Sequence, residues 1–296
     1  MRLRIPATTA NMGPGFDCIG MALSLYNYID FEPLDQEGSL LLTAEGAGAE
    51  EVSLSADNLI YQVYAKTLQS AGEPLYGIRM HFENHIPFSR GLGSSSAAII
   101  GGAVVANHLM GNRLSAEALL NVALGFEGHP DNIAPALLGG VVLSGLSEAG
   151  VFARRIKPPE ALHCAVLIPD YPLATAQARE VLPQTVPLAD AVFNVGRMGL
   201  LVNALHTGNL DDLALAMQDR LHQPYRRELI CAMTEIEQAA KAMGAKNVVI
   251  SGAGPTLLIV SDALLDFAPL AEILSAHGES GRVLALAPVD EGAALV

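Results

Sequence analysis

Apolar and polar positions divide the chain into a first half of short strands and a second half of helices. Before residue 150 the pattern predicts four extended runs: Leu3–Pro6, Ser24–Phe31, Leu40–Thr43 and Ile78–Phe82. A helical period predicts one helix over Asn58–Ala71, ended by Gly72, and another over Ser115–Glu127. Ser115 is a residue type that commonly caps the N-terminus of a helix.

Helical periodicity dominates the second half. It predicts three successive helices: Leu188–His206, Asp211–His222 and Glu228–Met243, the last ended by Gly244. The pattern then predicts two strands around a glycine-rich turn, one more helix and a final strand: Asn247–Ser251, Thr256–Ser261, Leu264–Ala276 and Arg282–Ala287. Because strands and helices do not alternate regularly, the fold class is α+β and not the doubly wound type.

A proline-rich break separates the two halves. Residues Lys157–Glu160 read KPPE and precede a new apolar run at Leu162–Ile168. A chain of 296 residues is long enough for two domains, each with a core of its own. We therefore predict an N-terminal domain over residues 1–157 and a C-terminal domain over residues 158–296.

Composition and charge exclude several classes of protein. The chain has 31 acidic and 17 basic residues, a net charge of −14 and no basic stripe, which argues against nucleic-acid binding. The start lacks the apolar core of a secretory signal, and no uninterrupted apolar stretch reaches the roughly 18–20 residues that span a membrane. Cys18, Cys164 and Cys231 are too far apart for a disulfide framework or a zinc site. We expect a cytoplasmic protein.

The most informative segment is a glycine–serine loop. Residues Pro87–Ala98 read PFSRGLGSSSAA, follow a strand and open a helix. Gly91 and Gly93 let the backbone approach an anion, which the N–H groups and the dipole of the helix would attract. The lysine of a Walker A loop is missing. The loop is either a phosphate site built from backbone or a capped helix after a glycine turn.

A second polar cluster, Glu127–Asn132, reads EGHPDN. Its oxygen ligands could hold Mg²⁺ and its donors could face a substrate, or it could be a polar turn that ends a helix. Two further glycine-rich segments, Pro6–Asp17 and Ser251–Thr256, carry little information by themselves, because loops and hairpins are often built this way.

These four segments, in this order, resemble the motifs of the GHMP small-molecule kinases. Pro6–Asp17 resembles the first motif of that superfamily, Pro87–Ala98 its phosphate loop and Ser251–Leu257 its third motif. The subfamily resemblance is to the homoserine kinases. Three further segments are typical of it: Glu127–Asn132, Thr175–Arg179 and Gln223–Arg226.

The resemblance implies a two-domain fold, with an N-terminal domain like the second domain of ribosomal protein S5 and a ferredoxin-like C-terminal domain. It implies ATP-dependent, Mg²⁺-assisted phosphorylation of the terminal hydroxyl of L-homoserine, a step of threonine biosynthesis. It is also compatible with a homodimer. Two alternatives stay open: a GHMP kinase for L-threonine, mevalonate or a related alcohol, and a non-catalytic relative that senses a ligand or binds a partner.

The resemblance also assigns nucleotide and metal ligands. Asn58 matches a position that helps to hold the adenine, and Ser95 and Glu127 are the expected Mg²⁺ ligands. The phosphates of ATP would lie along the loop, at Pro87, Arg90, Gly91, Leu92, Gly93, Ser94, Ser95, Ser96 and Ala97.

The substrate residues follow in the same way. Arg179 and Arg226 match the positions that grip the carboxylate, a task that suits the bidentate guanidinium group. Asp17 matches the position that meets the ammonium group. Asn11 and Asn132 match those near the reacting hydroxyl, with His129 close by. The catalytic residues expected are Glu127, Asn132 and Arg179, where Asn132 positions the hydroxyl. Asp131 is assigned a structural role or a role in supporting the residues that contact the substrate.

Overall fold

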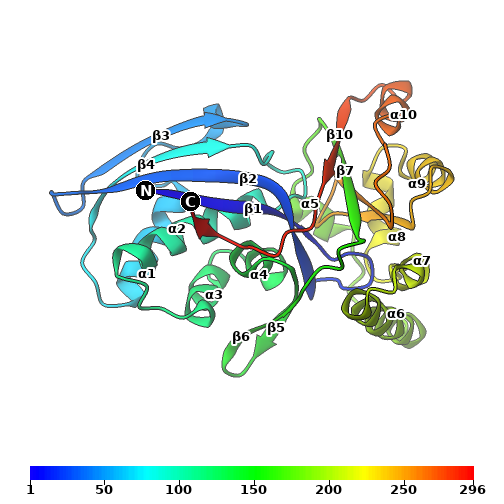
Figure 1. Cartoon of the computed structure of the whole chain (residues 1–296), viewed down its shortest axis with the longest axis horizontal. Coiled ribbons are helices and arrows are strands. Elements are labelled where there is room, and N and C mark those ends of the chain that lie inside the picture. Colours follow the sequence, from blue (N-terminus) through cyan, green and yellow to red (C-terminus); the bar gives the residue numbers. More distant parts are fainter.

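The computed structural model describes residues 1–296 and arranges them around two β-sheets (Figure 1). The larger sheet has seven strands, with a central path β11-β1-β2-β4-β3 from which β5 pairs with β2 and β6 with β5. The bounds of its strands are β1 (Arg2–Ala10), β2 (Ile19–Leu34), β3 (Leu40–Gly46), β4 (Gly77–Asn84), β5 (Val141–Ser147), β6 (Gly150–Ile156) and β11 (Ala294–Leu295).

Four helices cover one face of this sheet (Figure 1). They are α1 (Leu59–Ser70), α2 (Ser94–Leu109), α3 (Ala116–Leu124) and α4 (Pro130–Leu138), and a short 3-10 turn lies at Ala49–Glu51. The side chain of Asn58 accepts a hydrogen bond from the backbone of Tyr61 and so caps α1, and Ser115 caps α3 in the same way. Both helix predictions of the first half are confirmed, although α3 ends at Leu124.

The smaller sheet has four antiparallel strands in the order β10-β7-β9-β8. Its strands are β7 (His163–Pro169), β8 (Asn247–Ile250), β9 (Leu257–Ser261) and β10 (Gly281–Leu286). The helices around it are α5 (Thr175–Glu180), α6 (Leu188–Thr207), α7 (Leu213–Ala216), α8 (Gln223–Arg226), α9 (Met233–Ala242) and α10 (Leu270–Ala276), with 3-10 turns at Leu210–Asp212 and Arg227–Leu229. The predicted α+β class with two sheets is confirmed.

One apolar core joins the two sheets. A cluster of 51 buried residues extends from the larger sheet and its helices to Val166 on β7 and Leu258 on β9. A second cluster of 14 residues lies on the other face of the smaller sheet, where Leu167 and Ile259 pack against α9 and α10. Successive strand residues face opposite sides, so β7 serves both cores. The sheets are therefore packed into one body.

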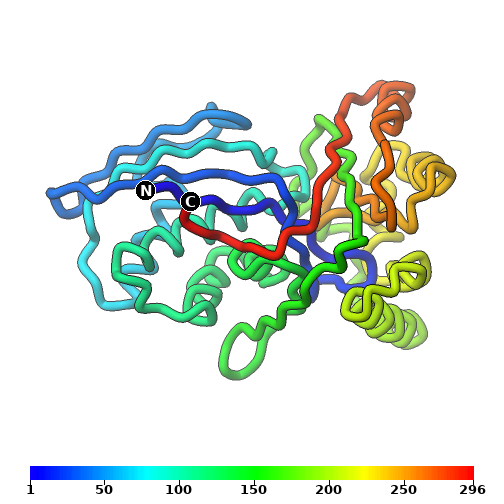
Figure 2. The backbone as a smooth tube through the Cα atoms, in the orientation of Figure 1, coloured from blue at the N-terminus to red at the C-terminus, as the bar shows by residue number.

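The C-terminal segment returns to the larger sheet. Figure 2 shows it crossing from the smaller sheet to end beside the N-terminus. Leu295 pairs with Leu3 in an antiparallel register, and the backbone of Val289 donates to that of Ala22. The domain division at residue 157 stays a prediction, and the last residues after β10 add to the sheet of the first half.

Several predicted helix limits are wrong. The helix predicted over Asp211–His222 ends at Ala216, because the buried Asp219 carboxylate accepts the backbone N–H groups of the next turn and competes with helical bonding. Ala232, with a φ of 53°, delays α9 to Met233. Pro269 precedes α10, which begins at Leu270 and not at Leu264.

The polar cluster after α3 is only partly a turn. Pro130 opens α4 and places Asp131 and Asn132 in the first turn of that helix, where proline is well tolerated.

Helix α6 is the one helix that is long and apolar enough to cross a membrane, and about 22% of its apolar window is buried in the protein.

A close contact between α1 and α2 leads to a test of this packing. A Cβ on Gly102 would lie 2.3 Å from the carbonyl oxygen of Ile60, so we expect Gly102→Ala to lower the free energy of unfolding by about 1–3 kcal/mol. Gly196, in the exposed part of α6, has open space around the position of a Cβ. Gly196→Ala should therefore raise the free energy of unfolding by up to about 1 kcal/mol. Urea titration of both variants checks the contrast, and equal effects would contradict it.

Candidate active site

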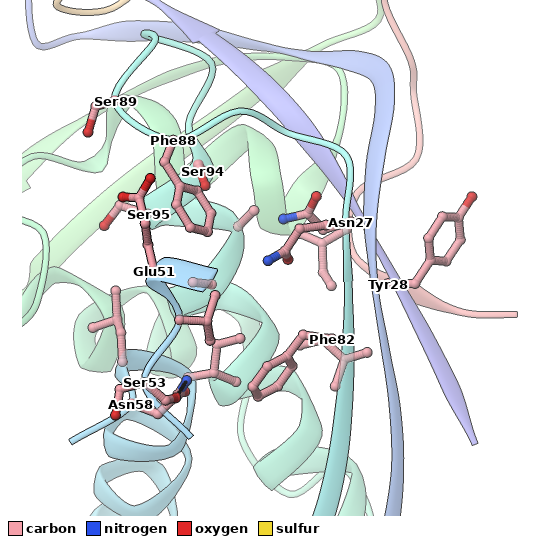
Figure 3. A pocket seen from close by; sticks show the side chains of 18 of the residues that line it. Asn27, Tyr28, Glu51, Ser53, Asn58, Phe82, Phe88, Ser89, Ser94 and Ser95 are labelled. Atoms are coloured by element: carbon pink, nitrogen blue, oxygen red, sulfur yellow. Dashed lines mark hydrogen bonds between the residues drawn. The ribbon is translucent and has the colours of Figure 1, made fainter. Parts of the chain in front are cut away.

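Two cavities meet at the loop between β4 and α2. The larger has a volume of about 440 Å³ and lies between this loop, α1 and the strands β2 and β4 (Figure 3). The smaller has a volume of about 180 Å³ and lies between the same loop, α4 and the elements of the smaller sheet. Ser89, Ser94 and Ser95 line both. A ligand could therefore extend from one cavity into the other past these serines.

The loop between the cavities presents backbone N–H groups at the start of α2. Gly93 caps the helix in the left-handed region with a φ of 69°, and Gly91 has a φ of 76°. No side chain caps the helix, so its first N–H groups are free to bind a ligand. No acidic residue lies in the first turn. The positive end of the helix dipole therefore faces the junction and favours an anion there.

Backbone contacts hold the loop in place. The hydroxyl of the buried Ser251 donates to the carbonyl of Gly91 at 2.6 Å, and its Oγ lies 2.9 Å from that of Thr9. The backbone N–H of Thr8 donates to the carbonyl of Leu92 at 3.1 Å. A Cβ on Gly91 would lie 2.3 Å from the Ser251 carbonyl oxygen, so this approach requires glycine.

The larger cavity is mainly apolar with polar groups at its rim. Phe82 and Phe88 line it, and Figure 3 shows their rings together with Asn27 and the serines of the loop. Asn58 lines it as well, but its amide is already occupied, because Nδ2 donates to the carbonyl of Ser53 while Oδ1 caps α1. The mixture suits a flat heterocycle whose polar tail reaches the loop.

A carboxylate faces the loop from the turn before α4. Glu127 Oε2 accepts a hydrogen bond from Ser96 Oγ at 3.0 Å. Burial raises the pKa of the Glu127 carboxyl, and hydrogen bonds from Ser96 and Ser95 oppose that rise. No group of three or more His, Cys, Asp and Glu side chains forms a metal cage. One carboxylate with neighbouring hydroxyls fits Mg²⁺, which usually binds few protein oxygens and completes its shell with phosphates and water.

The smaller cavity contains a carboxylate with two basic partners. Asp17 Oδ1 and Oδ2 accept from the Arg179 guanidinium at 2.7 and 3.1 Å, a bidentate pair. His129 Nε2 lies 3.3 Å from Asp17 Oδ2, and its Nδ1 lies 3.2 Å from Arg179 Nη2. Asn11 holds the segment between β1 and β2 that carries Asp17. Its Oδ1 accepts a hydrogen bond from the backbone N–H of Asp17, and its Nδ2 donates to the carbonyl of Gly252.

The second guanidinium of this cavity is buried. Arg226 is 1% exposed, and it donates to the carbonyl oxygens of Ala178 at 2.9 Å and Gly252 at 3.2 Å. Its Nη2 has no protein acceptor. Burial and the neighbouring Arg179 lower the pKa of Arg226 to about 10, so the group stays charged at neutral pH. Arg226 therefore lines the same cavity as Arg179, and its free Nη2 could bind a carboxylate ligand.

The first turn of α4 supplies an amide and a carboxylate. Asn132 Oδ1 accepts from Thr8 Oγ1 at 2.8 Å, which leaves its Nδ2 free to donate. Asp131 is 5% exposed. Burial, with the charges of Asp17 and Glu127, raises the pKa of the Asp131 carboxyl to about 7.

Comparison with known proteins identifies the family. Residues 58–140 match the family described as GHMP kinases N terminal domain, and residues 201–283 match GHMP kinases C terminal. A homoserine kinase of Synechocystis sp. is 46% identical over 87% of this chain and 85% of its own. A homoserine kinase of Desulfitobacterium hafniense is 42% identical over the full length of both chains. The chain belongs to the homoserine kinase family of GHMP kinases.

A solved homoserine kinase confirms the fold. The crystal structure of homoserine kinase from Cytophaga hutchinsonii has a TM-score of 0.91 and 26% identity, and the match covers 100% of this chain and 97% of that one. The GHMP kinase fold predicted from the four motifs is thereby confirmed, as is the resemblance to homoserine kinases.

Most residues predicted for the site line the two cavities. The smaller cavity is lined by Asn11, Asp17, Arg90, Gly91, Gly93, Ser94, Ser95, Ser96, Glu127, His129, Asn132, Arg179 and Arg226. Asn58 and Ala97 line the larger cavity, whereas Pro87 and Leu92 line neither. Arg90 donates to the carbonyl oxygens of Phe88, Pro169 and Asp170, so it holds the loop against the smaller sheet. The binding roles of all these residues stay predictions.

Some lining residues were missed by the sequence analysis. Phe82 and Asn27 lie on strands with no distinguishing motif, so no sequence signal pointed to them. Phe88 lies inside the segment Pro87–Ala98, and its place in that motif is the signal that could have found it. Phe16 lines neither cavity but lies in the segment Pro6–Asp17, beside two residues that do. The Phe16 ring lies 5.4 Å from the Arg179 guanidinium and 5.2 Å from that of Arg226, a favourable cation–π arrangement for both.

The hydroxyl of Ser251 offers a direct test of how the loop is held. In Ser251→Ala the Gly91 carbonyl loses its hydroxyl donor, so we expect the free energy of unfolding to fall by about 1–3 kcal/mol. Ser280→Ala removes an exposed hydroxyl that contacts Asp170, and it should change the free energy of unfolding by less than about 0.5 kcal/mol. Denaturant titration of both variants measures the difference, and a Ser251 variant as stable as the Ser280 variant would contradict the assigned contact.

Proposed function

We propose that this protein transfers the γ-phosphoryl group of ATP to the terminal hydroxyl of L-homoserine and forms O-phospho-L-homoserine for threonine biosynthesis. The observation that carries the proposal is the smaller cavity. It presents Arg179 and Arg226 for a carboxylate, and it opens past Ser94 and Ser95 to a larger cavity of suitable size for a nucleoside. A small amino-acid alcohol fits the 180 Å³ space between them.

The nucleotide is proposed to bind across both cavities. The adenosine would lie in the larger one beside Asn58 and Phe88, and the phosphates would accept hydrogen bonds from the backbone between Gly91 and Ala97. Glu127 and Ser95 would hold Mg²⁺ next to the phosphates. When bound, the ion offsets negative charge on the β- and γ-phosphates.

The substrate is proposed to bind with its carboxylate on Arg179 and Arg226. Bidentate guanidinium groups fix both the position and the rotation of a carboxylate, so the rest of the molecule points in one direction. The hydroxyl end would then reach Asn132, with Asn11 and His129 lining the same cavity. The ammonium group would lie near Asp17.

Phosphoryl transfer mainly requires alignment and charge stabilisation. Asn132 is held by Thr8 and can donate Nδ2 to an oxygen of the substrate or of the transferred group. The guanidinium of Arg179 is close enough to Asp17 and His129 to stay in a fixed orientation. On this proposal the residues of the site orient the hydroxyl, and no side chain has to accept its proton before the transfer.

We propose a cytoplasmic enzyme that needs no nucleic acid or membrane partner, and a homodimer is compatible with this proposal.

One experiment separates the proposed function from its two alternatives, another GHMP kinase and a non-catalytic relative. ADP release should be measured with L-homoserine, L-threonine and mevalonate in the presence of Mg²⁺. Turnover of L-homoserine with the highest kcat/KM supports the proposal. A preference for mevalonate would contradict the arginine assignments, and ATP binding without turnover of any alcohol would favour a ligand-sensing relative.

Removal of the Glu127 charge tests the proposed Mg²⁺ site. Glu127→Gln keeps the shape and the contact with Ser96 but loses the carboxylate, so we expect kcat to fall by roughly 10²–10³-fold. The concentration of Mg²⁺ needed for half-maximal activity should rise as well. Steady-state kinetics over a Mg²⁺ titration measure both quantities. Unchanged activity at saturating Mg²⁺ would remove Glu127 from the site.

The guanidinium fork of Arg226 gives a second test. Arg226→Lys retains the charge but not the bidentate geometry, so the KM for L-homoserine should rise by about 10- to 100-fold while the KM for ATP changes little. Arg227→Lys is the matched control, because Arg227 instead pairs with Glu237 at 2.9 Å outside the cavity. Kinetics with each substrate varied in turn decide the question. A selective loss of ATP affinity would show that Arg226 does not bind the carboxylate.

A further inference from the structure

One buried titratable residue beside the smaller cavity has no part in the binding roles proposed above. His222 directly precedes α8 and is 0% exposed. Its ring Nε2 lies 2.8 Å from the carbonyl oxygen of Gly13, and its Nδ1 lies 3.4 Å from Arg226 Nη1. The imidazole therefore connects the segment between β1 and β2 with the buried guanidinium of the cavity.

These two contacts define the protonation of the ring. A carbonyl oxygen can only accept a hydrogen bond, so Nε2 carries the proton and the lone pair of Nδ1 is left to accept from Arg226. Burial lowers the pKa of His222; the Asp219 carboxylate opposes this effect, and the charge of Arg226 adds to it. The ring is therefore neutral at neutral pH, as an acceptor for a guanidinium has to be.

Asp219 holds the backbone from which this ring extends. Its carboxylate is fully buried and accepts the backbone N–H groups of His222 at 2.9 Å and Gln223 at 2.7 Å. Asn194 on α6 donates to the same carboxylate at 2.7 Å and to the carbonyl of Pro14 at 3.2 Å. The position of His222 is therefore fixed by a buried network of hydrogen bonds.

The guanidinium of Arg226 is oriented by three acceptors. Its Nε donates to the carbonyl of Ala178 at 2.9 Å, and its Nη1 contacts the carbonyl of Gly252 at 3.2 Å and His222 Nδ1 at 3.4 Å. His222 is the only side chain among the three. Because a guanidinium is planar and rigid, acceptors at Nε and Nη1 also fix the direction of Nη2, which is left for a ligand.

We propose that His222 is a positioning residue for the substrate: it accepts from Arg226 Nη1 so that Nη2 is aimed at the substrate carboxylate, and its bond to Gly13 sets the separation between Arg226 and Asp17. The inference rests on the proposed function, in which Arg226 binds the carboxylate and Asp17 lies near the ammonium group. His222 lines neither cavity, so it acts through Arg226.

The ring of Phe16 supports the same arrangement. It stacks on the imidazole of His222 with ring centroids 5.2 Å apart and planes inclined by 24°, and the guanidinium of Arg226 lies 5.2 Å from its centroid. Since Phe16 directly precedes Asp17, His222 contacts the segment that carries Asp17 at two points. An α-amino acid carries its carboxylate and ammonium on one carbon, so it requires the two binding groups at one fixed separation.

Two substitutions separate the two contacts of the ring. Asparagine places an amide oxygen near the position of Nδ1 but does not reach Gly13, whereas glutamine places an amide nitrogen near the position of Nε2 but offers Arg226 no acceptor. In His222→Gln we expect the KM for L-homoserine to rise about 10- to 30-fold, with kcat and the KM for ATP within about threefold. In His222→Asn this KM should stay within about threefold of the wild type, although the thermal midpoint should fall.

Dependence on the substrate carboxylate gives a second readout. 3-Aminopropan-1-ol is L-homoserine without its carboxylate, so its inhibition constant should change by less than about twofold in His222→Gln. His277→Gln is the matched control, because His277 is exposed and contacts Glu235 outside both cavities. The control should leave the KM values, the inhibition constant and the thermal midpoint unchanged.

Every other outcome would overturn the inference. A KM for L-homoserine in His222→Gln within about threefold of the wild type would show that His222 does not orient Arg226. Equal rises in both variants, or equal weakening of L-homoserine and 3-aminopropan-1-ol, would show a structural role. If His222→Gln does not fold, His222→Asn decides the question, and a rise of its KM above about threefold overturns the inference.

The same measurements separate the inference from the proposed function. If the wild-type enzyme does not phosphorylate L-homoserine, the proposed function fails and the inference fails with it. If the wild type is active and His222→Gln behaves like it, the inference alone fails.

Discussion

Close backbone packing at one junction is the constraint on which the site depends. The loop before α2, the end of β1 and the turn between β8 and β9 contact one another through main-chain and hydroxyl hydrogen bonds. A Cβ on Gly93 would lie 1.9 Å from Thr8 Oγ1, so the loop cannot approach β1 with any larger residue there. The Gly252 carbonyl of this junction accepts from both Asn11 and Arg226. The loop before α2 and Arg226 are therefore held in one fixed relation.

This junction also explains how an acidic chain can handle anions. The net charge of −14 argues against a broad positive surface, and on the proposed function the site would use backbone N–H groups, the half-buried Arg179 and the buried Arg226 instead. Both guanidinium groups face Phe16, and Arg179 is neutralised by Asp17. The smaller cavity thus contains two guanidinium groups, one of which is balanced within the protein. The net charge says little about what the cavity binds.

Local signals in the sequence were sufficient for the elements that bear the motifs. Asn58 and Ser115 are true helix caps, and Gly91 and Gly93 have positive φ angles, which fit both a phosphate loop and a glycine turn before a helix. Distant contacts explain the failures. Asp219 ends a helix through hydrogen bonds that its periodic neighbours do not reveal, and the pairing of β11 with β1 joins the two ends of the chain. The partners of Asp17 come from two other elements, so their convergence could not be predicted from spacing.

The order of residues at the start of α4 reflects a division of charge within the cavity. Consecutive helix positions differ in direction by about 100°, so Asp131 and Asn132 face different neighbours. Asn132 Oδ1 lies 3.3 Å from the position that a Cβ of Gly93 would occupy, which places this amide against the phosphate loop. If the loop binds phosphates as proposed, a carboxylate there would repel them, whereas an amide can donate to them. On the proposed function, the neutral amide of Asn132 therefore lies at the phosphate end of the cavity.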